Sequence, residues 1–487
     1  MAKNKISDIL LKKMTIFRVM VILLILFVIP AFINYDFNKE NRFVGAKISL
    51  PYLYAGDQIH YYVLVYSLLK DRDIDVRNNY HNSEYNLTYD LGYLFRGQYI
   101  GGQVGYFNFK TRDYKPFYEG RTAFETPDPG KDYGKIIIRP LGLPLFYYVL
   151  LLPFNFLPNP EPMVVFLTVF LTLIGIYFFF LTLNHLLKDE IISLFFTLLL
   201  GISSELWHYS KLFYPDVLQF FLLSLIIYLF IVKDNNLGVG FLFAVGIFAR
   251  PTFIVLLPFF VLYRFFHQEE FPAFSDVWKN KRRLFNPSII KKILFLLMPI
   301  AMIFFFQMYL NYYFFGNIFS NPNFMMFHFE NILTGLWISF FQIDRGLFIF
   351  SPIMIFAILG LKSFYNKHKM DSIFIYATIS CFVLFLSSTS VNKYFHDTYS
   401  IRYYVSIIPY FFIPIAFWYK EVTSNKEEFK KNKIWIYLFY IALIISILIN
   451  FQAAIFHTLI WGGPPWQIIS LLIENWSHFG IPPINLI

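Results

Sequence analysis

The stretch GDQIHYYVLVYSLLKDRDIDVRNNY (residues 56–80) follows the first strongly apolar segment of the chain, residues 15–35. A glycine and an aspartate open it, an aromatic run follows, and dense alternating charge closes it. The aromatic run is too short and too rich in tyrosine to cross a bilayer, which takes about 20 apolar residues. We therefore expect a helix at the membrane surface, immediately outside the first membrane crossing.

The composition is typical of a membrane protein. Of the 487 residues, 57% are hydrophobic and only 15% are charged, whereas soluble domains carry about 25% charged residues. Several stretches exceed the roughly 18 apolar residues of a membrane-spanning helix. Most of the net charge of +10 lies in short loops, which is the usual orienting bias of membrane proteins. Nucleic acid is therefore not an expected partner.

Basic residues and a proline determine the predicted topology. Four lysines within residues 3–13 precede the first span, so we expect a cytoplasmic N-terminus. The apolar residues 241–263 contain Arg250-Pro251, which predicts a hairpin because proline interrupts a helix. Residues 143–158 are expected to form an interfacial or half-inserted helix. Further spans are predicted at residues 162–184, 191–209, 215–232, 291–313, 346–364, 372–389, 403–419 and 434–455.

These assignments predict an all-α polytopic membrane protein with about eleven transmembrane helices. Its expected parts are a cytoplasmic N-terminus with the first span (1–35), a large first external loop with juxtamembrane helices (36–161), the rest of the core module (162–266), a basic cytoplasmic loop (267–290), a C-terminal transmembrane module (291–455) and an external tail (456–487).

Ionisable residues gather near the predicted external ends of the spans. Because such groups are costly at membrane depth, each is a functional candidate. A transporter would place some of them near the membrane midplane, so we interpret the cluster as a site at the external membrane surface. Its members are Asp57, His60, Arg139, Lys211, Asp216, Arg250, Asp344, Arg345, His396, Asp397 and Arg402.

Asp57 stands at the start of the expected surface helix, on one face with His60, Tyr61 and Leu64. It could cap the N-terminus of that helix, a role that aspartate fills well. It could also point into a cavity as a general base or a metal ligand. The two roles are compatible, since capping would orient the carboxylate.

Four arginines lie at external span boundaries beside proline, glycine or aromatic residues. Each alone could extend to the headgroup layer, but four on one side favour a phosphate site, because the guanidinium fork suits phosphate oxygens. A lipid headgroup or a lipid-linked phosphate is the expected ligand. The candidate phosphate-binding residues are Arg139, Arg250, Arg345 and Arg402, together with Lys211.

Residues 56–80 resemble the first external loop of bacterial GT-C glycosyltransferases, of the protein O-mannosyltransferase and lipid A aminoarabinose transferase type. Later segments are similar to that group in the same order, and the resemblance runs from about residue 15 to 415. These segments are LWHYSKLFYPDVLQFFLLSLIIYL (206–229), GIFARPTFIVLLP (246–258), NYYFFGNIFS (311–320), DRGLFIFSPIM (344–354) and DTYSIRYYVSIIP (397–409).

The resemblance implies a multi-pass enzyme of the bacterial inner membrane. It would move a sugar from a polyprenyl-phosphate donor to a lipid, glycan or protein acceptor at the periplasmic face, with inversion. The matching positions imply Asp57 as the catalytic base and Asp216 as a second carboxylate, while Arg250, Arg345 and Arg402 would hold the donor phosphate. We expect substrate contacts from Gln58, His60, Tyr61 and His396.

Two positions depart from the pattern of that group. Gln58 stands where a glutamate is usual, and an amide is a poorer metal ligand than a carboxylate. We therefore expect transfer without a metal cofactor, by Asp57 alone or with Asp216. Ser400 stands where glycine is frequent, which could alter the approach to Arg402.

Two other classes of protein remain as alternatives. An O-antigen or oligosaccharide ligase would use a pyrophosphate-linked donor, but its large external loop usually comes late in the chain, not between the first two spans. A lipid or polysaccharide transporter without chemistry would show polar residues throughout the membrane and internal symmetry. Neither feature is evident in this sequence.

Overall fold

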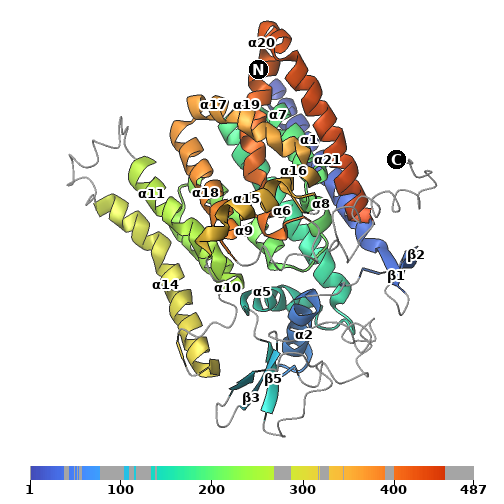
Figure 1. Cartoon of the computed structure of the whole chain (residues 1–487), viewed down its shortest axis with the longest axis vertical. Helices are drawn as coiled ribbons and strands as arrows, with labels where there is room; N and C mark the ends of the chain where they lie inside the picture. The colour runs from blue at the N-terminus through green and yellow to red at the C-terminus, as the bar shows by residue number, and fades with distance from the viewer. Residues whose placement is uncertain are drawn as a thin grey trace.

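The structure is a computed structural model and describes residues 2–37, 43–48, 50–51, 53, 57–76, 104–108, 114–116, 133–137, 140–267, 287–315, 317–318, 328–343, 345–389 and 400–455. The described chain is mainly helical, and its long helices pack side by side in one bundle (Figure 1). The α-helices are α1 (Ala2–Phe32), α2 (Asp57–Lys70), α5 (Gly142–Leu151), α6 (Glu161–Leu187), α7 (Glu190–Ile202), α8 (Leu206–Tyr209), α9 (Pro215–Ile227), α10 (Asn236–Ala249), α11 (Leu257–His267), α14 (Pro287–Phe315), α15 (Ile332–Phe341), α16 (Leu347–Phe350), α17 (Ala357–Lys367), α18 (Lys369–Ser387), α19 (Ile408–Ser424), α20 (Lys426–Lys431) and α21 (Lys433–Ile455).

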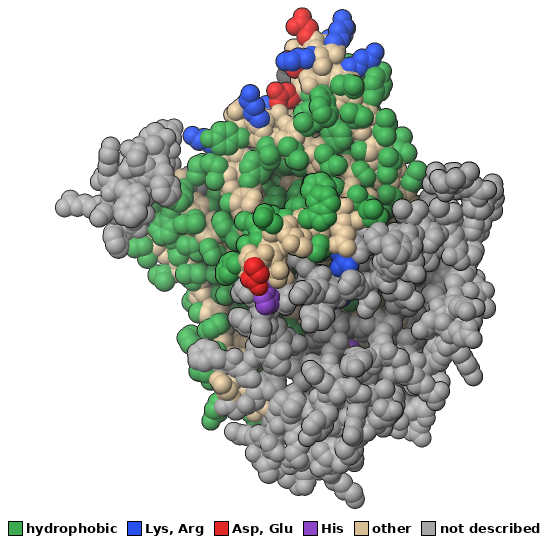
Figure 2. All heavy atoms as spheres, viewed as in Figure 1, with side chains coloured by type: hydrophobic (Ala, Val, Ile, Leu, Met, Phe, Trp, Pro, Cys, Tyr) green, Lys and Arg blue, Asp and Glu red, His purple; other side chains and the backbone are tan. Residues whose placement is uncertain are grey.

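Six of these helices are long and apolar enough to cross a membrane. The apolar windows are Thr15–Phe32, Glu161–Leu187, Pro215–Val232, Pro287–Phe314, Lys369–Ser387 and Lys433–Ile455. On the face drawn in Figure 2, hydrophobic side chains form a broad band over the helices, and charged side chains gather at the end near α20. The prediction of a helical multi-pass membrane protein is confirmed at this level, and the count of about eleven spans stays a prediction.

The chain folds back at Arg250, as the sequence predicts. Helix α10 ends at Ala249, and the 3-10 helix η3 (Pro251–Leu256) leads into α11. The rings of Phe243 and Phe260 are 4.8 Å apart, although a straight helix would separate them by about 25 Å at 1.5 Å per residue. The segments α10 and α11 therefore form a hairpin with Arg250 at its turn.

Three predicted spans are interrupted rather than continuous. The predicted span 191–209 ends as α7 at Ile202, before a serine pair and Glu205. The span predicted at 346–364 is divided into α16, the 3-10 helix η5 (Pro352–Phe356) and α17, because Pro352 cannot continue the hydrogen bonding of α16. The span predicted at 403–419 starts as the 3-10 helix η8 (Arg402–Tyr404) and continues as α19. Short irregular segments with polar residues thus enter the bundle at one end.

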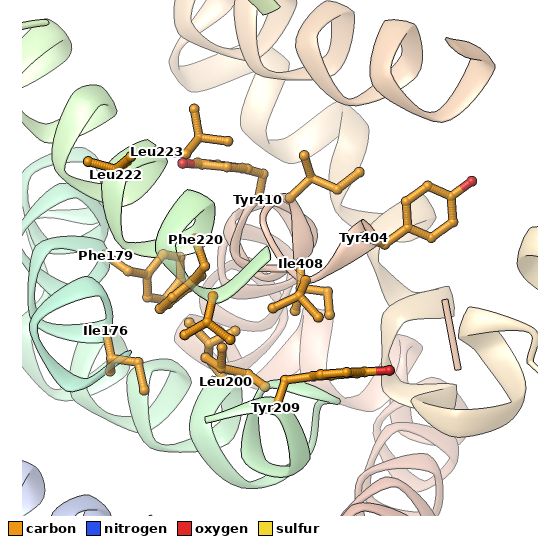
Figure 3. Close-up of a cluster of buried hydrophobic side chains, with 14 of the residues drawn as sticks. Ile176, Phe179, Leu200, Tyr209, Phe220, Leu222, Leu223, Tyr404, Ile408 and Tyr410 are labelled. Carbon is orange, nitrogen blue, oxygen red and sulfur yellow. The ribbon is translucent and has the colours of Figure 1, made fainter. Parts of the chain in front are cut away.

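The centre of the bundle is apolar. Figure 3 shows buried side chains from four helices meeting there: Ile176 and Phe179 of α6, Leu200 of α7, Phe220 of α9 and Ile408 of α19. Each of these five residues is almost fully buried. This packing fixes the ends of α7, α9 and α19, from which several candidate site residues project.

The predicted first external loop contains the expected juxtamembrane helices α2 and α5, which lie side by side at one end of the bundle (Figure 1). It also holds small antiparallel sheets, which the all-α prediction did not include. Strands β1 (Ile33–Phe37) and β2 (Phe43–Ile48) pair, and β3 (Val104–Asn108) lies between β4 (Tyr114–Pro116) and β5 (Tyr133–Ile137).

Glycine allows α5 to approach the α10–α11 turn closely. A Cβ atom at Gly142 would lie 2.3 Å from the backbone nitrogen of Ala249, so only glycine fits at this crossing. The α2–α5 pair is therefore held beside the turn that carries Arg250.

Candidate functional site

Asp216 is the centre of a charged cluster at the end of the bundle where α2 and α5 lie. It occupies the first turn of α9, after Pro215, whose fixed φ suits a helix start. Its Oδ1 atom accepts a hydrogen bond from Arg250 Nη1, and its Oδ2 atom is 3.9 Å from Arg402 Nε. Asp216 is 1% exposed, whereas Arg250 and Arg402 are 11% and 13% exposed. The carboxylate is buried beneath two guanidinium groups that remain partly open.

Aromatic rings hold the two guanidinium groups in place. The guanidinium carbon of Arg250 lies 3.7 Å from the ring centroid of Tyr403, and that of Arg402 lies 4.6 Å from the centroid of Tyr214. Cation–π contacts of this kind contribute about 0.5–2 kcal/mol each. Stacking fixes the plane of each guanidinium group, so its remaining N–H donors keep a defined direction.

The cluster places two cationic side chains at a partly exposed position. The guanidinium groups of Arg250 and Arg402 lie over the carboxylate of Asp216. A planar guanidinium group can bind two oxygens of one phosphate or carboxylate. The arrangement is therefore chemically suited to an anionic ligand.

Helix α2 is attached to the segment that leads into Asp216. Gln58, in the first turn of α2, accepts a hydrogen bond from the backbone N–H of Phe213 through Oε1 at 2.9 Å. The ring of Tyr61 packs edge-on against Phe213 at 6.2 Å, and Tyr147 of α5 contacts the same ring at 4.6 Å. Gln58 and Tyr61 are buried, so both expected substrate-binding residues have a structural role at this contact.

Asp57 is the first residue of α2, directly before Gln58. The contact between Gln58 and Phe213 therefore places the start of α2 beside the segment that leads into Asp216, because Phe213 lies shortly before Asp216 in the sequence. The side chain of Asp57 lies outside the described residues, as do Arg139 and His396, and their predicted roles stay predictions. His60, the fourth expected substrate-binding residue, is buried at 2% exposure.

Lys211 has a different environment from the one expected of a phosphate-binding residue. Its ammonium group is buried and donates hydrogen bonds to the carbonyl oxygens of Pro30 in α1, at 3.2 Å, and Ala454 in α21, at 2.6 Å. The neighbouring His208 contacts the carbonyl oxygen of Ala453 at 2.8 Å. Burial lowers the pKa of Lys211 to about 7. These contacts join the ends of α1 and α21 to the segment before Asp216.

Arg345 is buried near the segment that carries Arg402. Its carbonyl oxygen is 3.2 Å from the hydroxyl of Ser400, two residues before Arg402. That hydroxyl is also 3.1 Å from Glu205 Oε1.

The structure thus brings together some predicted site residues and adds others. Asp216, Arg250 and Arg402 form one cluster, and Gln58 and Tyr61 attach α2 beside it. Sequence reasoning missed Tyr214, Tyr403 and Glu205. The two tyrosines adjoin residues that were singled out, and Glu205 is an acidic residue within an apolar stretch, which is itself a signal.

Within the described ranges, no group of three or more histidine, cysteine, aspartate or glutamate side chains could hold a metal ion. The side chain of Asp57 is outside those ranges, so metal-independent transfer stays a prediction. No protein-family model and no curated protein matches this chain.

Proposed function

We propose that this protein is a membrane glycosyltransferase with a GT-C fold and about eleven spans. It would move a sugar from a polyprenyl-phosphate donor to a lipid, glycan or protein acceptor at the periplasmic face of the bacterial inner membrane. The observation that carries the proposal is the cluster in which Arg250 and Arg402 cover the buried Asp216 at one end of the bundle. The N-terminus would then be cytoplasmic, as the lysines before the first span indicate.

The two guanidinium groups of the cluster support a phosphate as the ligand. When a sugar leaves a polyprenyl phosphate, negative charge grows on the phosphate oxygens in the transition state. Guanidinium groups that are already fixed in position stabilise that charge without reorganising. Arg250 and Arg402 are fixed in this way by Tyr403 and Tyr214.

Asp57 is the proposed general base. The acceptor oxygen would form a bond to the anomeric carbon while the bond from that carbon to the phosphate oxygen breaks. The acceptor proton would pass to the Asp57 carboxylate, and the phosphate would leave with the electron pair. Attack from the face opposite the phosphate inverts the anomeric centre. The attachment of α2 through Gln58 to the segment before Asp216 supports this placement of Asp57.

A donor panel tests the proposal. The purified full chain in nanodiscs would be incubated with undecaprenyl-phosphate sugars and membrane extract, and the labelled product would be followed by mass spectrometry. We expect transfer from at least one monophosphate donor. Transfer from pyrophosphate-linked donors alone would indicate a ligase, and lipid flux in liposomes without any sugar transfer would indicate a transporter. Either result would overturn the proposal.

A further inference from the structure

Glu205 is a buried carboxyl group that joins three segments distant in the sequence. It follows α7 and is 2% exposed. Its Oε2 atom is 3.1 Å from the hydroxyl of Ser351, which lies between α16 and η5, and its Oε1 atom is 3.1 Å from the hydroxyl of Ser400. The Glu205 side chain, in the predicted core module (162–266), therefore contacts Ser351 and Ser400. Both serines lie in irregular segments of the predicted C-terminal module (291–455).

The hydrogen bonds of the Ser400 hydroxyl indicate the protonation state of the Glu205 carboxyl group. The Ser400 hydroxyl lies within hydrogen-bond distance of both Glu205 Oε1 and the carbonyl oxygen of Arg345. A hydroxyl has one hydrogen, and a carbonyl oxygen can only accept. If Ser400 donates to Arg345, Glu205 must donate to Ser400 through a protonated Oε1. The neutral acid therefore satisfies both contacts.

The second oxygen of Glu205 connects to another part of the bundle. Ser351 donates to Oε2, and its oxygen is 3.3 Å from the amide nitrogen of Asn450 in α21. Asn450 also donates to the carbonyl oxygen of Phe350 at 2.9 Å. The break between α16 and η5 is thus held between Glu205 and α21.

Ser400 has a backbone conformation that requires support. Its φ is 49°, in the left-handed region that a residue with a Cβ atom rarely adopts. Such a conformation costs about 1–3 kcal/mol and persists where surrounding contacts hold it. The hydroxyl contacts with Glu205 and Arg345 are contacts of that kind, and a glycine at this position would lack them. The backbone conformation of Ser400 therefore determines the position of Arg402, which is the first residue of η8.

We propose that Glu205, as a neutral carboxylic acid, is a positioning residue that fixes the Arg345 and Arg402 segments relative to Asp216. The inference rests on the proposed function in one respect, that Arg402 belongs to a phosphate site. Glu205 does not act on substrate in this account. It acts through Ser351 and Ser400.

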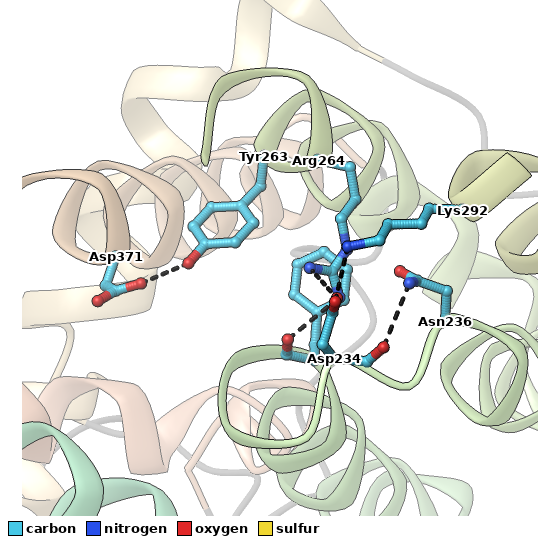
Figure 4. Close-up of polar contacts among 7 residues, drawn as sticks. Asp234, Asn236, Tyr263, Arg264, Lys292 and Asp371 are labelled. Carbon is cyan, nitrogen blue, oxygen red and sulfur yellow. Dashed lines mark hydrogen bonds and ion pairs between the residues drawn. The ribbon is translucent and has the colours of Figure 1, made fainter. Parts of the chain in front are cut away.

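Two substitutions separate this role from a catalytic one. Glu205→Gln keeps one donor and one acceptor at the same position, as in the neutral acid. Glu205→Leu keeps a similar volume and removes both hydrogen bonds. The matched control is Asp371→Asn, since Asp371 accepts a hydrogen bond from Tyr263 at 2.5 Å and so joins α11 to α18 at the other end of the α10–α11 hairpin (Figure 4).

The experiment uses the full chain in nanodiscs and has two readouts. Hydrogen–deuterium exchange is measured over residues 345–351 and 400–405, and undecaprenyl phosphate in phosphatidylglycerol vesicles serves as the binding probe. For Glu205→Leu we expect exchange in both segments to rise about tenfold and binding of the probe to weaken about tenfold. Glu205→Gln and Asp371→Asn should stay within about twofold of the wild type in both readouts, since neither removes the contacts at Ser400.

Unchanged exchange in Glu205→Leu would overturn the positioning role. Equal losses in Glu205→Gln and Glu205→Leu would show that the negative charge of Glu205 is needed, which contradicts the neutral form. If the wild type binds no undecaprenyl phosphate, the proposed function fails at this step. The exchange readout still decides whether Glu205 holds the two segments.

Discussion

Arg250 and Arg264 lie at opposite ends of the α10–α11 hairpin and have similar surroundings. Arg250 pairs with Asp216 and stacks on Tyr403. Arg264 pairs with Asp234 at 2.8 Å and stacks on Phe230 at 3.8 Å (Figure 4). The similarity makes Arg264 a matched control for Arg250, because both arginines contribute to packing and only one belongs to the candidate site.

Arg250→Gln should lower the rate of sugar transfer by about 10²–10³-fold, the range found when one fixed donor to a transition-state oxyanion is removed. Arg264→Gln removes an equivalent ion pair and ring contact and should change the rate by less than about threefold, because it lies a full helix length from Asp216. Initial rates of the two purified variants check this. Equal losses would show that the arginines act only through folding.

Asp216→Asn should strengthen the binding of a phosphate ligand. The substitution removes the carboxylate that faces Arg250 and Arg402, so the charge of the cluster becomes more positive by one unit. Without ligand, the variant should unfold at a lower temperature than the wild type, because burying arginines without a counter-ion is costly. Undecaprenyl phosphate should then raise its unfolding temperature more than it raises that of the wild type. A smaller rise would contradict an anion site at these arginines.

Helix α2 is attached to the segment before Asp216 by the Gln58 hydrogen bond and by the packing of Tyr61 on Phe213. Gln58 supplies the acceptor for the backbone N–H of Phe213, and both groups are buried. A buried donor left without a partner costs about 1–3 kcal/mol. The position of α2 should therefore be sensitive to the acceptor at residue 58.

Gln58→Leu should lower both the thermal stability of the protein and the rate of sugar transfer, because Phe213 loses its acceptor. Gln58→Glu keeps an acceptor oxygen for the backbone N–H of Phe213 and should lose less stability than Gln58→Leu, although it buries a carboxyl group. Heating followed by size-exclusion chromatography in detergent measures the first effect. A Gln58→Leu variant as stable as the wild type would rule out this contact as the attachment of α2.

Several elements could be predicted from the sequence, because their signals are local. The long apolar helices follow from hydropathy, and the α10–α11 turn follows from Arg250-Pro251. The pairing of Arg250 with Asp216 could not be predicted, since it depends on how α9 and α10 pack. The same holds for Glu205, whose partners Ser351 and Ser400 are distant in the sequence. Side-chain partners of this kind are set by tertiary packing.

Over the whole molecule, charged and hydrophobic side chains occupy different parts of the helix bundle. On the face drawn in Figure 2, hydrophobic side chains form a band, and charged side chains gather at the end near α20. Lysines gather around α20 at one end of the bundle (Figures 1 and 2). The Asp216 cluster lies at the other end, to which α2 is attached through Gln58. By the positive-inside rule we expect α20 on the cytoplasmic side. The candidate site would then lie on the external side.

Cysteine labelling tests that orientation. The background would be Cys381→Ser, which removes the single native cysteine. In intact spheroplasts, a membrane-impermeant maleimide should label Arg72→Cys, since Arg72 is exposed in the turn directly after α2. Lys430→Cys in α20 should react only after permeabilisation. The opposite pattern would place the Asp216 cluster in the cytoplasm.

In the proposed mechanism Asp57 is the general base beside a phosphate site formed by Arg250 and Arg402. The decisive comparison is between Asp57→Asn and the double variant Arg250→Gln/Arg402→Gln, using one active polyprenyl-phosphate sugar and undecaprenyl phosphate as the binding probe. Loss of a general base costs about 10²–10⁴-fold in rate. We predict that Asp57→Asn loses transfer by that factor and still binds the probe, whereas the double variant loses both. A fully active, correctly folded Asp57→Asn protein would contradict the account.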